Sequence, residues 1–224
     1  INSTNHILIC GWNVEEGINV VKEITSDSPN RSIVIIANLD EHPAMDFHQV
    51  SFVKGRATDK KVLEKSNAGK CSTALIFAEN SLDPSSDGKT VLAVMNLKSI
   101  NPKMFICAEL VDENNKDYLE KAGCDSVIDI TRFGSNMMVQ SIKDPGISNV
   151  VSRLVSNRIG NTFYRIPLPT DYTNKTFKEI QSGLDKMIVV GYERNGEQKV
   201  NPPKDEVLKD GDFLFVISTK RPSF

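Results

Sequence analysis

The segment Asn5-His6-Ile7-Leu8-Ile9-Cys10-Gly11-Trp12-Asn13 contains a compact apolar run, residues 6–10, that ends at a glycine. Residues 13–25 follow with apolar side chains at helical spacing, which predicts a helix. The next run, residues 33–37, is almost wholly β-branched, as expected for a strand that is buried on both faces. A strand, a helix and a doubly buried strand in this order are typical of a parallel sheet covered by helices.

The same alternation continues to about residue 130. The sequence predicts further strands at 50–53, 73–78, 104–108 and 126–130, and helices at 58–66, 90–100 and 114–122. Thr58 is the expected N-cap of the helix that follows it. The pattern therefore predicts an α/β fold with a Rossmann-like, doubly wound parallel sheet.

After Phe133 the pattern changes to two short amphipathic helices around the turn Asp144-Pro145-Gly146. Beyond residue 160, short strands, one helix and an Asn195-Gly196 hairpin turn predict a small α+β lobe. We therefore expect three parts: a Rossmann-like lobe at 1–131, a helical crossover hairpin at 132–160 and a C-terminal lobe at 161–224.

The apolar face of this hairpin needs a partner. It could pack on the chain's own sheet, but the strands and helices before it already supply both layers of a doubly wound fold. We therefore expect a subunit interface and a homodimer. The residues expected in the interface are Phe133, Met137, Met138, Ile142, Ile147, Val150, Val151, Leu154 and Val155, with Ile159 at the end of the stripe.

Composition excludes several classes of protein. Charged residues make up 25% of the chain and hydrophobic ones 39%, which argues against disorder. Lys plus Arg number 27 against 29 Asp plus Glu, so no basic footprint for nucleic acid is present. The longest apolar run, residues 33–37, is far below the ~20 residues that cross a bilayer, so we expect no direct membrane insertion. The chain begins at Ile1 without a methionine, and we expect it to be a processed chain or part of a longer one.

Catalytic and metal-binding motifs are absent from the sequence. The four cysteines form no CxxC pair and are expected to be buried, reduced thiols, and no GxSxG, Walker or HExxH motif occurs. We therefore predict no catalytic residues, no metal site and no enzymatic activity. Five carboxylates near the ends of two predicted strands are expected to be solvated loop charges: Asp83, Asp87, Glu109, Asp112 and Glu113.

Ligands of a doubly wound sheet bind at the carboxyl ends of its strands. In the first such loop only Gly11 fits the dinucleotide fingerprint, because Asn13 and Glu16 stand at the other two glycine positions and Gly17 comes one place late. Two glutamates in the helix's first turn oppose an anion, although they are equally ordinary complements to the helix dipole. The candidates at this edge of the sheet are Gly11, Trp12, Asn13, Asn38, Asp40 and Arg56.

Arg56 is the most suggestive of these candidates. A guanidinium at the carboxyl end of a strand can hold a phosphate. It can equally pair with Asp59 or with another surface carboxylate, and the sequence leaves the two interpretations open.

An ordered set of stretches resembles RCK domains, the regulators of potassium conductance. The opening segment is followed by others that cover nearly the whole chain, and the tail resembles the family's TrkA-C-like lobe. These stretches are Val53-Lys54-Gly55-Arg56-Ala57-Thr58, Val62-Leu63-Glu64-Lys65-Ser66, Ala108-Glu109, Leu119-Glu120-Lys121-Ala122-Gly123-Cys124-Asp125-Ser126-Val127-Ile128, Ser141-Ile142-Lys143-Asp144-Pro145-Gly146, Asn201-Pro202-Pro203 and Leu208-Lys209-Asp210-Gly211-Asp212.

The resemblance implies a cytosolic, ligand-sensing gating domain of a potassium channel. Such domains assemble as dimers and then as a gating ring, octameric in its largest expected form, at the cytoplasmic face of the cell membrane. The pore domain is expected upstream in the same chain. Two alternatives remain: a regulatory subunit of a Trk/Ktr-type potassium transporter, and a nucleotide-dependent oxidoreductase.

The resemblance also bears on the ligand. Calcium-gated members have an acid where this chain has Arg56 and a second acid where it has Val111, so that only Glu109 is retained and joins the ligand candidates. Nucleotide-binding members carry the full glycine fingerprint, which is incomplete here. We therefore expect a nucleotide (AMP, ADP, ATP or NAD) rather than calcium, with its identity open.

Overall fold

The computed structural model describes residues 3–158 and 160–224 of the chain. The chain divides into two compact units, Ile1–Val139 and Gln140–Phe224, and each is described by itself. The boundary between the units falls inside one helix, α5 (Ile130–Lys143). The division into three parts at 131 and 160 stays a prediction.

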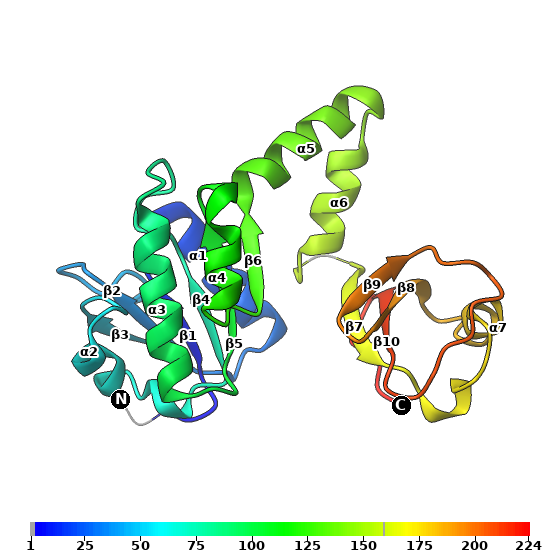
Figure 1. Cartoon of the computed structure of the whole chain (residues 1–224), viewed down its shortest axis with the longest axis horizontal. Helices are drawn as coiled ribbons and strands as arrows, with labels where there is room; N and C mark the ends of the chain where they lie inside the picture. Colours follow the sequence, from blue (N-terminus) through cyan, green and yellow to red (C-terminus); the bar gives the residue numbers. More distant parts are fainter. Residues whose placement is uncertain (1–2, 159) are drawn as a thin grey trace. The chain divides into compact units, whose positions relative to one another are not determined.

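The first unit is built on a six-stranded parallel sheet (Figure 1). Its strand order is β3-β2-β1-β4-β5-β6, and all neighbouring strands pair in parallel. The order reverses between β1 and β4, which is the switch point at which such sheets bind ligands. The strands are β1 (Ile7–Cys10), β2 (Ile33–Ala37), β3 (Val50–Lys54), β4 (Thr73–Ile76), β5 (Phe105–Leu110) and β6 (Ser126–Asp129).

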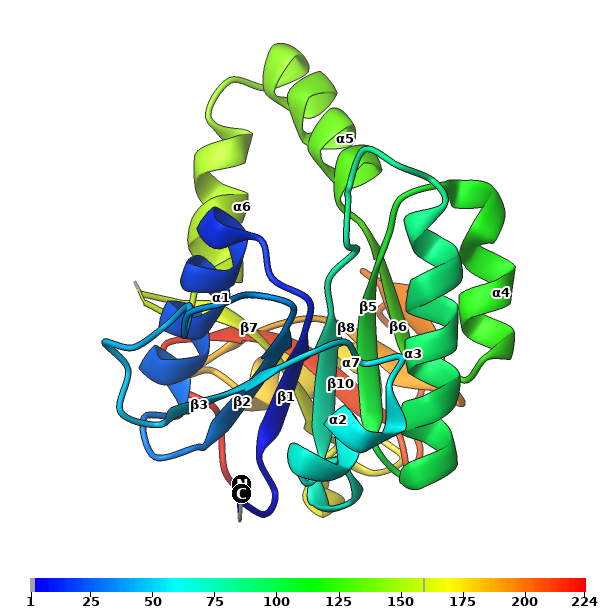
Figure 2. The ribbon, with the colours of Figure 1, turned by 90° about the vertical axis from the view of Figure 1, so that its left-hand side faces the viewer.

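Helices cover both faces of this sheet, as the side view in Figure 2 shows. Helix α1 lies on one face, where Val21 packs in one core with Ile33 and Ile35 of β2. The other helices lie on the opposite face, in a core that contains Val34 and Ile36. All five residues of β2 are buried, which confirms the prediction of a strand covered on both faces. The helices are α1 (Val14–Asp27), α2 (Lys60–Lys65), α3 (Ser86–Ile100) and α4 (Lys116–Lys121), with 3-10 turns η1 (Ala68–Lys70) and η2 (Glu113–Asn115).

Several predicted boundaries are wrong: the strand expected at 73–78 ends at Ile76, and three helix starts also differ. The N-cap of α2 is Asp59 and not Thr58, because the Asp59 side chain accepts a hydrogen bond from the backbone N–H of Lys61. Helix α3 begins at Ser86, four residues before the expected start, through a polar first turn that carries no apolar periodicity. Ile130 does not end the last strand but begins α5.

The hairpin region forms two helices, as predicted. Helix α5 ends at Lys143 and α6 (Ile147–Val155) begins after three intervening residues, the last of which is Gly146 with φ of 99°. Neither helix has a buried residue in the described part of the chain. Ile159, the last residue of the predicted stripe, lies outside the described residues.

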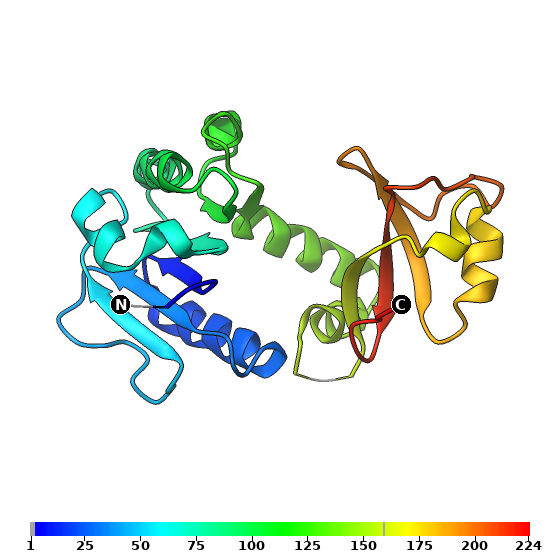
Figure 3. The ribbon, with the colours of Figure 1, turned by 90° about the horizontal axis from the view of Figure 1, so that it is seen from below.

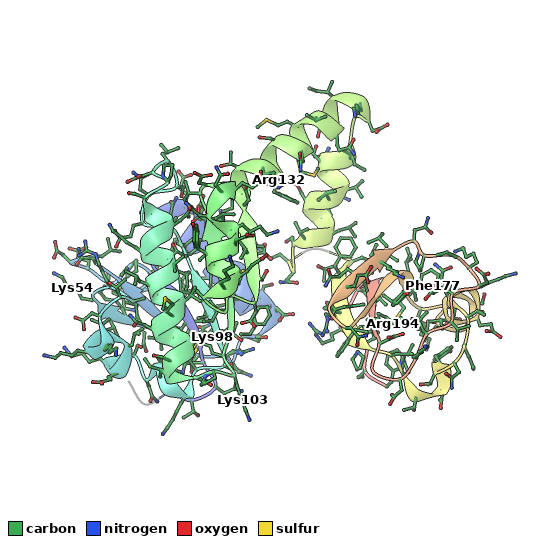
Figure 4. All side chains as sticks on the ribbon, in the orientation of Figure 1. Lys54, Lys98, Lys103, Arg132, Phe177 and Arg194 are labelled. Carbon is green, nitrogen blue, oxygen red and sulfur yellow. The ribbon has the colours of Figure 1, made fainter. Side chains whose placement is uncertain are left out.

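The second unit contains a four-stranded antiparallel sheet in the order β7-β10-β8-β9, and helix α7 (Phe177–Gly183) shares a core with it (Figure 3). Asn195 and Gly196 both have positive φ, 53° and 83°, so they form the predicted hairpin turn between β8 and β9. Figure 4 labels Phe177, at the start of the helix, and Arg194, at the end of β8. The elements are β7 (Thr162–Pro167), η3 (Thr170–Tyr172), α7 (Phe177–Gly183), β8 (Ile188–Arg194), β9 (Glu197–Val200) and β10 (Phe213–Ser218).

Helix length and polarity also bear on membrane insertion. Across residues 3–158 and 160–224, no helix is both long enough and apolar enough to cross a membrane.

Candidate functional site

A pocket of about 250 Å³ opens at the carboxyl edge of the six-stranded sheet. The loops that follow β1, β2, β3 and β4 contribute to it, together with the first turns of α3, so it lies at the switch point of the sheet. Four of the predicted ligand residues line it: Gly11, Trp12, Asn38 and Arg56. Its other lining residues include Leu39, Thr58, Phe77, Glu79, Lys89 and Thr90.

Gly11 makes the tight turn at the floor of this pocket. Its φ is +81°, and a Cβ placed there would stand 2.9 Å from the carbonyl oxygen of Phe77. Its backbone N–H donates to the carbonyl of Ile36 at 2.9 Å. A side chain at this position is therefore excluded by both conformation and space.

Three of the pocket's charged side chains form one ion-pair cluster. Arg56 Nε donates to Glu79 Oε1 at 3.0 Å, and Lys89 Nζ donates to Glu79 Oε2 at 2.6 Å. Hydrogen bonds from Lys89 and then from Arg56 hold the pKa of the Glu79 carboxyl below its usual range, against the opposing effect of partial burial. Of the two interpretations of Arg56 left open by the sequence, the structure shows pairing with a carboxylate, and the partner is Glu79 rather than Asp59.

The other predicted ligand residues lie elsewhere. Asn13 is the exposed N-cap residue of α1, and its side chain makes no capping hydrogen bond. Asp40 is 94% exposed and pairs with Lys54 Nζ at 2.6 Å. Glu109 is 5% exposed and accepts a hydrogen bond from the backbone N–H of Ala78 at 2.9 Å. None of these three lines the pocket among the described residues.

Glu16, at the start of α1, is more than a complement to the helix dipole. One carboxylate oxygen is buried without a hydrogen-bond partner in the described part of the chain. Partial burial raises the pKa of Glu16, and the neighbouring charges of Glu109 and Glu15 raise it further. A partly buried carboxyl group whose pKa is raised by two neighbouring acids is not explained by the helix dipole alone.

The expectation that the five loop carboxylates are solvated is wrong for two of them. Glu109 is buried as described, and Asp87 is 1% exposed and accepts hydrogen bonds from the backbone N–H groups of Val111 and Asp112. These two acids hold loops together. Among the described residues, no group of three or more His, Cys, Asp or Glu side chains could hold a metal ion.

The four cysteines are all free. Cys10, Cys71 and Cys124 are buried as predicted, whereas Cys107 is only half-buried. Burial raises the pKa of each of these thiols, which makes them poor nucleophiles.

The predicted interface residues are largely exposed in the single chain. Met137, Val151 and Leu154 are half-buried, and α6 contacts β7 within the second unit. The remaining six are exposed to solvent by 37% or more: Phe133, Met138, Ile142, Ile147, Val150 and Val155.

Glu79 and Lys89 are the charged residues of the pocket that the sequence did not predict. Glu79 comes directly after the predicted strand 73–78 and three residues after the end of β4, at the carboxyl edge where the other candidates were sought, so the same rule could have found it. Lys89 lies in a helical turn that was not expected to be helical, and no sequence signal brings it to Glu79.

Comparison with known families covers nearly the whole chain. Residues 7–130, more than half of the chain, match the TrkA-N domain family. Residues 131–223 match the family described as Castor and Pollux, part of voltage-gated ion channel.

The similar proteins are channels. The calcium-gated potassium channel TvoK of Thermoplasma volcanium is 22% identical over 222 residues, which cover 97% of this chain and 63% of that protein. Potassium channel protein 1 of Methanocaldococcus jannaschii is 25% identical over 224 residues, covering 96% of this chain and 64% of that protein. The chain thus spans less than two thirds of the length of these relatives.

Solved structures show the same fold at low identity. The human SLO3 gating ring superposes with a TM-score of 0.70 at 17% identity, covering 96% of this chain and 44% of that one. The RCK domain of GsuK gives a TM-score of 0.51 at 21% identity, with 97% of this chain and 44% of that chain covered. The fold is that of an RCK domain, as the sequence resemblance predicted, and the chain belongs to the TrkA-N domain family.

Proposed function

We propose that this chain is the ligand-sensing gating domain of a potassium channel, placed at the cytoplasmic face of the cell membrane beneath a pore in the same protein. The observation that carries the proposal is the pocket at the switch point of an RCK-type sheet. Two relatives that match nearly the whole chain are potassium channels, which supports a channel over a transporter subunit or an oxidoreductase.

The ligand that suits this pocket carries a phosphate. Arg56 and Lys89 provide two cations against the single carboxylate of Glu79, so the cluster has a net positive charge. Asn38 and Thr58 add polar groups, and Trp12, Leu39 and Phe77 add apolar walls for a base. This combination of a charged end and an apolar wall is the composition of a nucleotide site.

The size of the pocket favours one nucleoside unit over two. Its volume of about 250 Å³ is below the ~300–1,000 Å³ of typical small-molecule sites. In addition, the N-terminus of α1 carries Glu15 and Glu16 in its first turn, which opposes a pyrophosphate there. AMP, ADP or ATP therefore fits better than NAD, although a structure of the related GsuK channel was solved with NAD bound.

Calcium suits this pocket poorly. Glu79 is the one acid among the described lining residues, and two cations already occupy it. At ~4 Å and an effective dielectric of ~20, each unit of like charge costs about 4 kcal/mol before solvent screening. A divalent ion beside Arg56 and Lys89 would meet this repulsion from both.

The domain acts as a regulator and not as an enzyme. Cys10 is the thiol in the pocket wall, and burial raises its pKa, which is the reverse of what a nucleophile requires. No histidine is among the described lining residues, so a general base of the usual kind is missing.

Assembly requires two kinds of exposed surface. The apolar residues of α5 and α6, such as Ile142 at 82% and Val150 at 52% exposure, serve a two-fold dimer contact. A ring needs a second, different contact between dimers, because one two-fold contact closes on itself. Leu92 and Met95 on α3, each 54% exposed, and Tyr118 on α4, 61% exposed, offer that second surface.

Calorimetry tests the ligand. The 224-residue chain is titrated with AMP, ADP, ATP, NAD and calcium chloride, beside the variant Arg56→Gln. We expect a mononucleotide to bind and Arg56→Gln to weaken it by about tenfold or more, the usual worth of a charge-assisted hydrogen bond. Calcium binding to the pocket without a nucleotide response would contradict the proposal.

Potassium flux tests the gating role. In liposomes that contain the full-length protein, flux should change with the nucleotide that binds, and Arg56→Gln should shift the response to higher concentration. If the isolated domain binds a nucleotide but the potassium flux of the full-length protein does not change with that nucleotide, the ligand proposal stands and the gating proposal fails.

A further inference from the structure

We propose that Glu79 is an internal competitor for the ligand's phosphate. Its carboxylate engages the two cations that a phosphate would use, and it thereby sets the affinity and the charge selectivity of the pocket. This inference rests on the proposed nucleotide function of the same pocket and identifies a specificity-determining residue within it.

The hydrogen bonds of the cluster show that Glu79 engages both cations. Each carboxylate oxygen of Glu79 takes one cation: Oε1 accepts from Arg56 Nε at 3.0 Å, and Oε2 accepts from Lys89 Nζ at 2.6 Å. The three residues come from separate parts of the chain, namely the loop after β3, the loop after β4 and the start of α3. All three line the pocket, so the cluster lies on the surface that a ligand would contact.

A phosphate and a carboxylate compete for the same donors. Both present negatively charged oxygens to a guanidinium and an ammonium, and the guanidinium matches both groups in geometry. The terminal nitrogens of Arg56 can also contact a phosphate while Nε still holds Glu79. In that arrangement two anions lie within a few ångströms of each other, and their repulsion again lowers the affinity.

Glu79 can also leave the cluster at low cost. Its side chain is 36% exposed, and those of Arg56 and Lys89 are 55% and 56% exposed. Exchange of Glu79 for a phosphate therefore buries no unpaired charge, because the released carboxylate can turn into water. The hydrogen bonds that lower its pKa keep Glu79 ionised at neutral pH, so the competitor is present under ordinary conditions.

The consequence is selectivity for ligand charge. A ligand without phosphate gains nothing from displacing Glu79, whereas a diphosphate outcompetes a single carboxylate. Removal of the Glu79 charge should therefore tighten phosphate-bearing ligands and leave a neutral nucleoside unaffected.

The test is a titration of the 224-residue chain with ADP and with adenosine, at low and at high salt. The test variant is Glu79→Gln, which keeps the shape of the side chain. The control variant is Glu64→Gln, which removes the same charge from an exposed position on α2 in the same unit. We expect Glu79→Gln to bind ADP at least about fivefold more tightly at low salt, and Glu64→Gln to stay within about twofold of the original chain. The gain should shrink at high salt and be absent for adenosine.

Three results would overturn the inference. If the original chain binds ADP and Glu79→Gln binds it equally, Glu79 is no competitor, while the proposed nucleotide function stands. If Glu79→Gln binds ADP more weakly, Glu79 is a ligand contact. If neither binds ADP or any other nucleotide, the proposed function and this inference fail together.

Discussion

The indole ring of Trp12 lies directly against Gly17. A Cβ placed on Gly17 would stand 2.7 Å from two atoms of the ring, closer than real Cβ contacts allow. Trp12 forms part of the pocket wall, and Gly17 is buried in the early part of α1. The lack of a side chain at position 17 therefore allows α1 to pack against a residue that shapes the pocket.

Substitution of Gly17 should disturb this contact. We expect Gly17→Ala to lower the free energy of unfolding by about 1–3 kcal/mol, because the added methyl group overpacks the ring. Gly88→Ala is the matched control: Gly88 is an exposed helical glycine whose added Cβ meets nothing within 4 Å. That change should stabilise by about 0.5–1 kcal/mol.

Urea unfolding followed by tryptophan emission measures both variants, since Trp12 is the single tryptophan of the chain. If Gly17→Ala is as stable as the original chain and its emission is unchanged, the packing of Trp12 on Gly17 does not constrain the pocket.

The sheet was predictable from the sequence, because burial on both faces leaves a mark there. Residues 33–37 match β2 at both ends, since four β-branched residues in a row suit no other buried element of that length. Helix starts that consist of polar residues have no comparable sequence pattern, so they could not be predicted in this way. The first turn of α3 contains Asp87, whose buried carboxylate accepts backbone hydrogen bonds, and apolar periodicity cannot show that role.

The candidate site was only partly predictable. Because ligands bind at the carboxyl ends of parallel strands, the sequence identified Gly11, Trp12, Asn38 and Arg56, which do line the pocket. It could not show that Glu109 points to the backbone of Ala78. Gly17 appeared to be a misplaced fingerprint residue, and its use became visible only when the position of the Trp12 ring was known.

The dimer contact can be tested at residues that the single chain does not use. Val151 and Leu154 are half-buried, so charges there would disturb the second unit itself. Ile142 and Val150 are sharper choices because both are mostly exposed. We expect the double variant Ile142→Glu, Val150→Glu to sediment as a monomer and to keep its circular dichroism.

The control for this experiment is Met45→Glu, a 72% exposed apolar residue in the loop between β2 and β3. It should sediment like the original chain. A dimer that survives the double change on α5 and α6 would place the interface elsewhere.

The surface on α3 should matter only for assembly beyond the dimer. Because a ring needs a second contact, Leu92→Glu with Met95→Glu should leave dimers and remove larger species in light scattering. The variant on α5 and α6 should thus lose the dimer, whereas the variant on α3 should lose only assembly beyond the dimer. If the α3 variant gives monomers, the proposed roles of the two surfaces are reversed.

In the second unit, Arg194 joins β8 to the turn before β10. Arg194 Nε and Nη2 donate to the two oxygens of Asp212 at 2.9 and 2.7 Å, and Nη2 also donates to the carbonyl of Val207. The Asp212 side chain is 3% exposed and also accepts from the backbone N–H of Lys209. Burial acts to raise the pKa of Asp212, but the hydrogen bonds from Arg194 and Lys209 prevail and hold it below its usual range.

This direction fixes how stability should depend on pH. A carboxyl group with a lowered pKa binds a proton more readily in the unfolded chain, so its contribution is present above the ordinary aspartate value of ~4 and is lost as the pH falls through the folded value. We expect Asp212→Asn to cost about 2–3 kcal/mol at pH 7, because it removes the buried carboxylate that holds Arg194 and leaves only the longer ion pair with Glu206 at 3.4 Å. As the pH falls below ~4, the gap between variant and original chain should narrow.

Hydrogen exchange of β8 and β10 is the appropriate measurement, because a chain of two units need not unfold in one step. Asp210→Asn is the control, since Asp210 is exposed in the same turn and undergoes the same chemical change. Its exchange rates should follow those of the original chain at every pH. If Asp212→Asn opens β8 and β10 no faster than Asp210→Asn does at pH 7, the pair with Arg194 does not hold the sheet. If the gap between the two variants persists unchanged below pH ~4, Asp212 is not the group whose protonation weakens this unit.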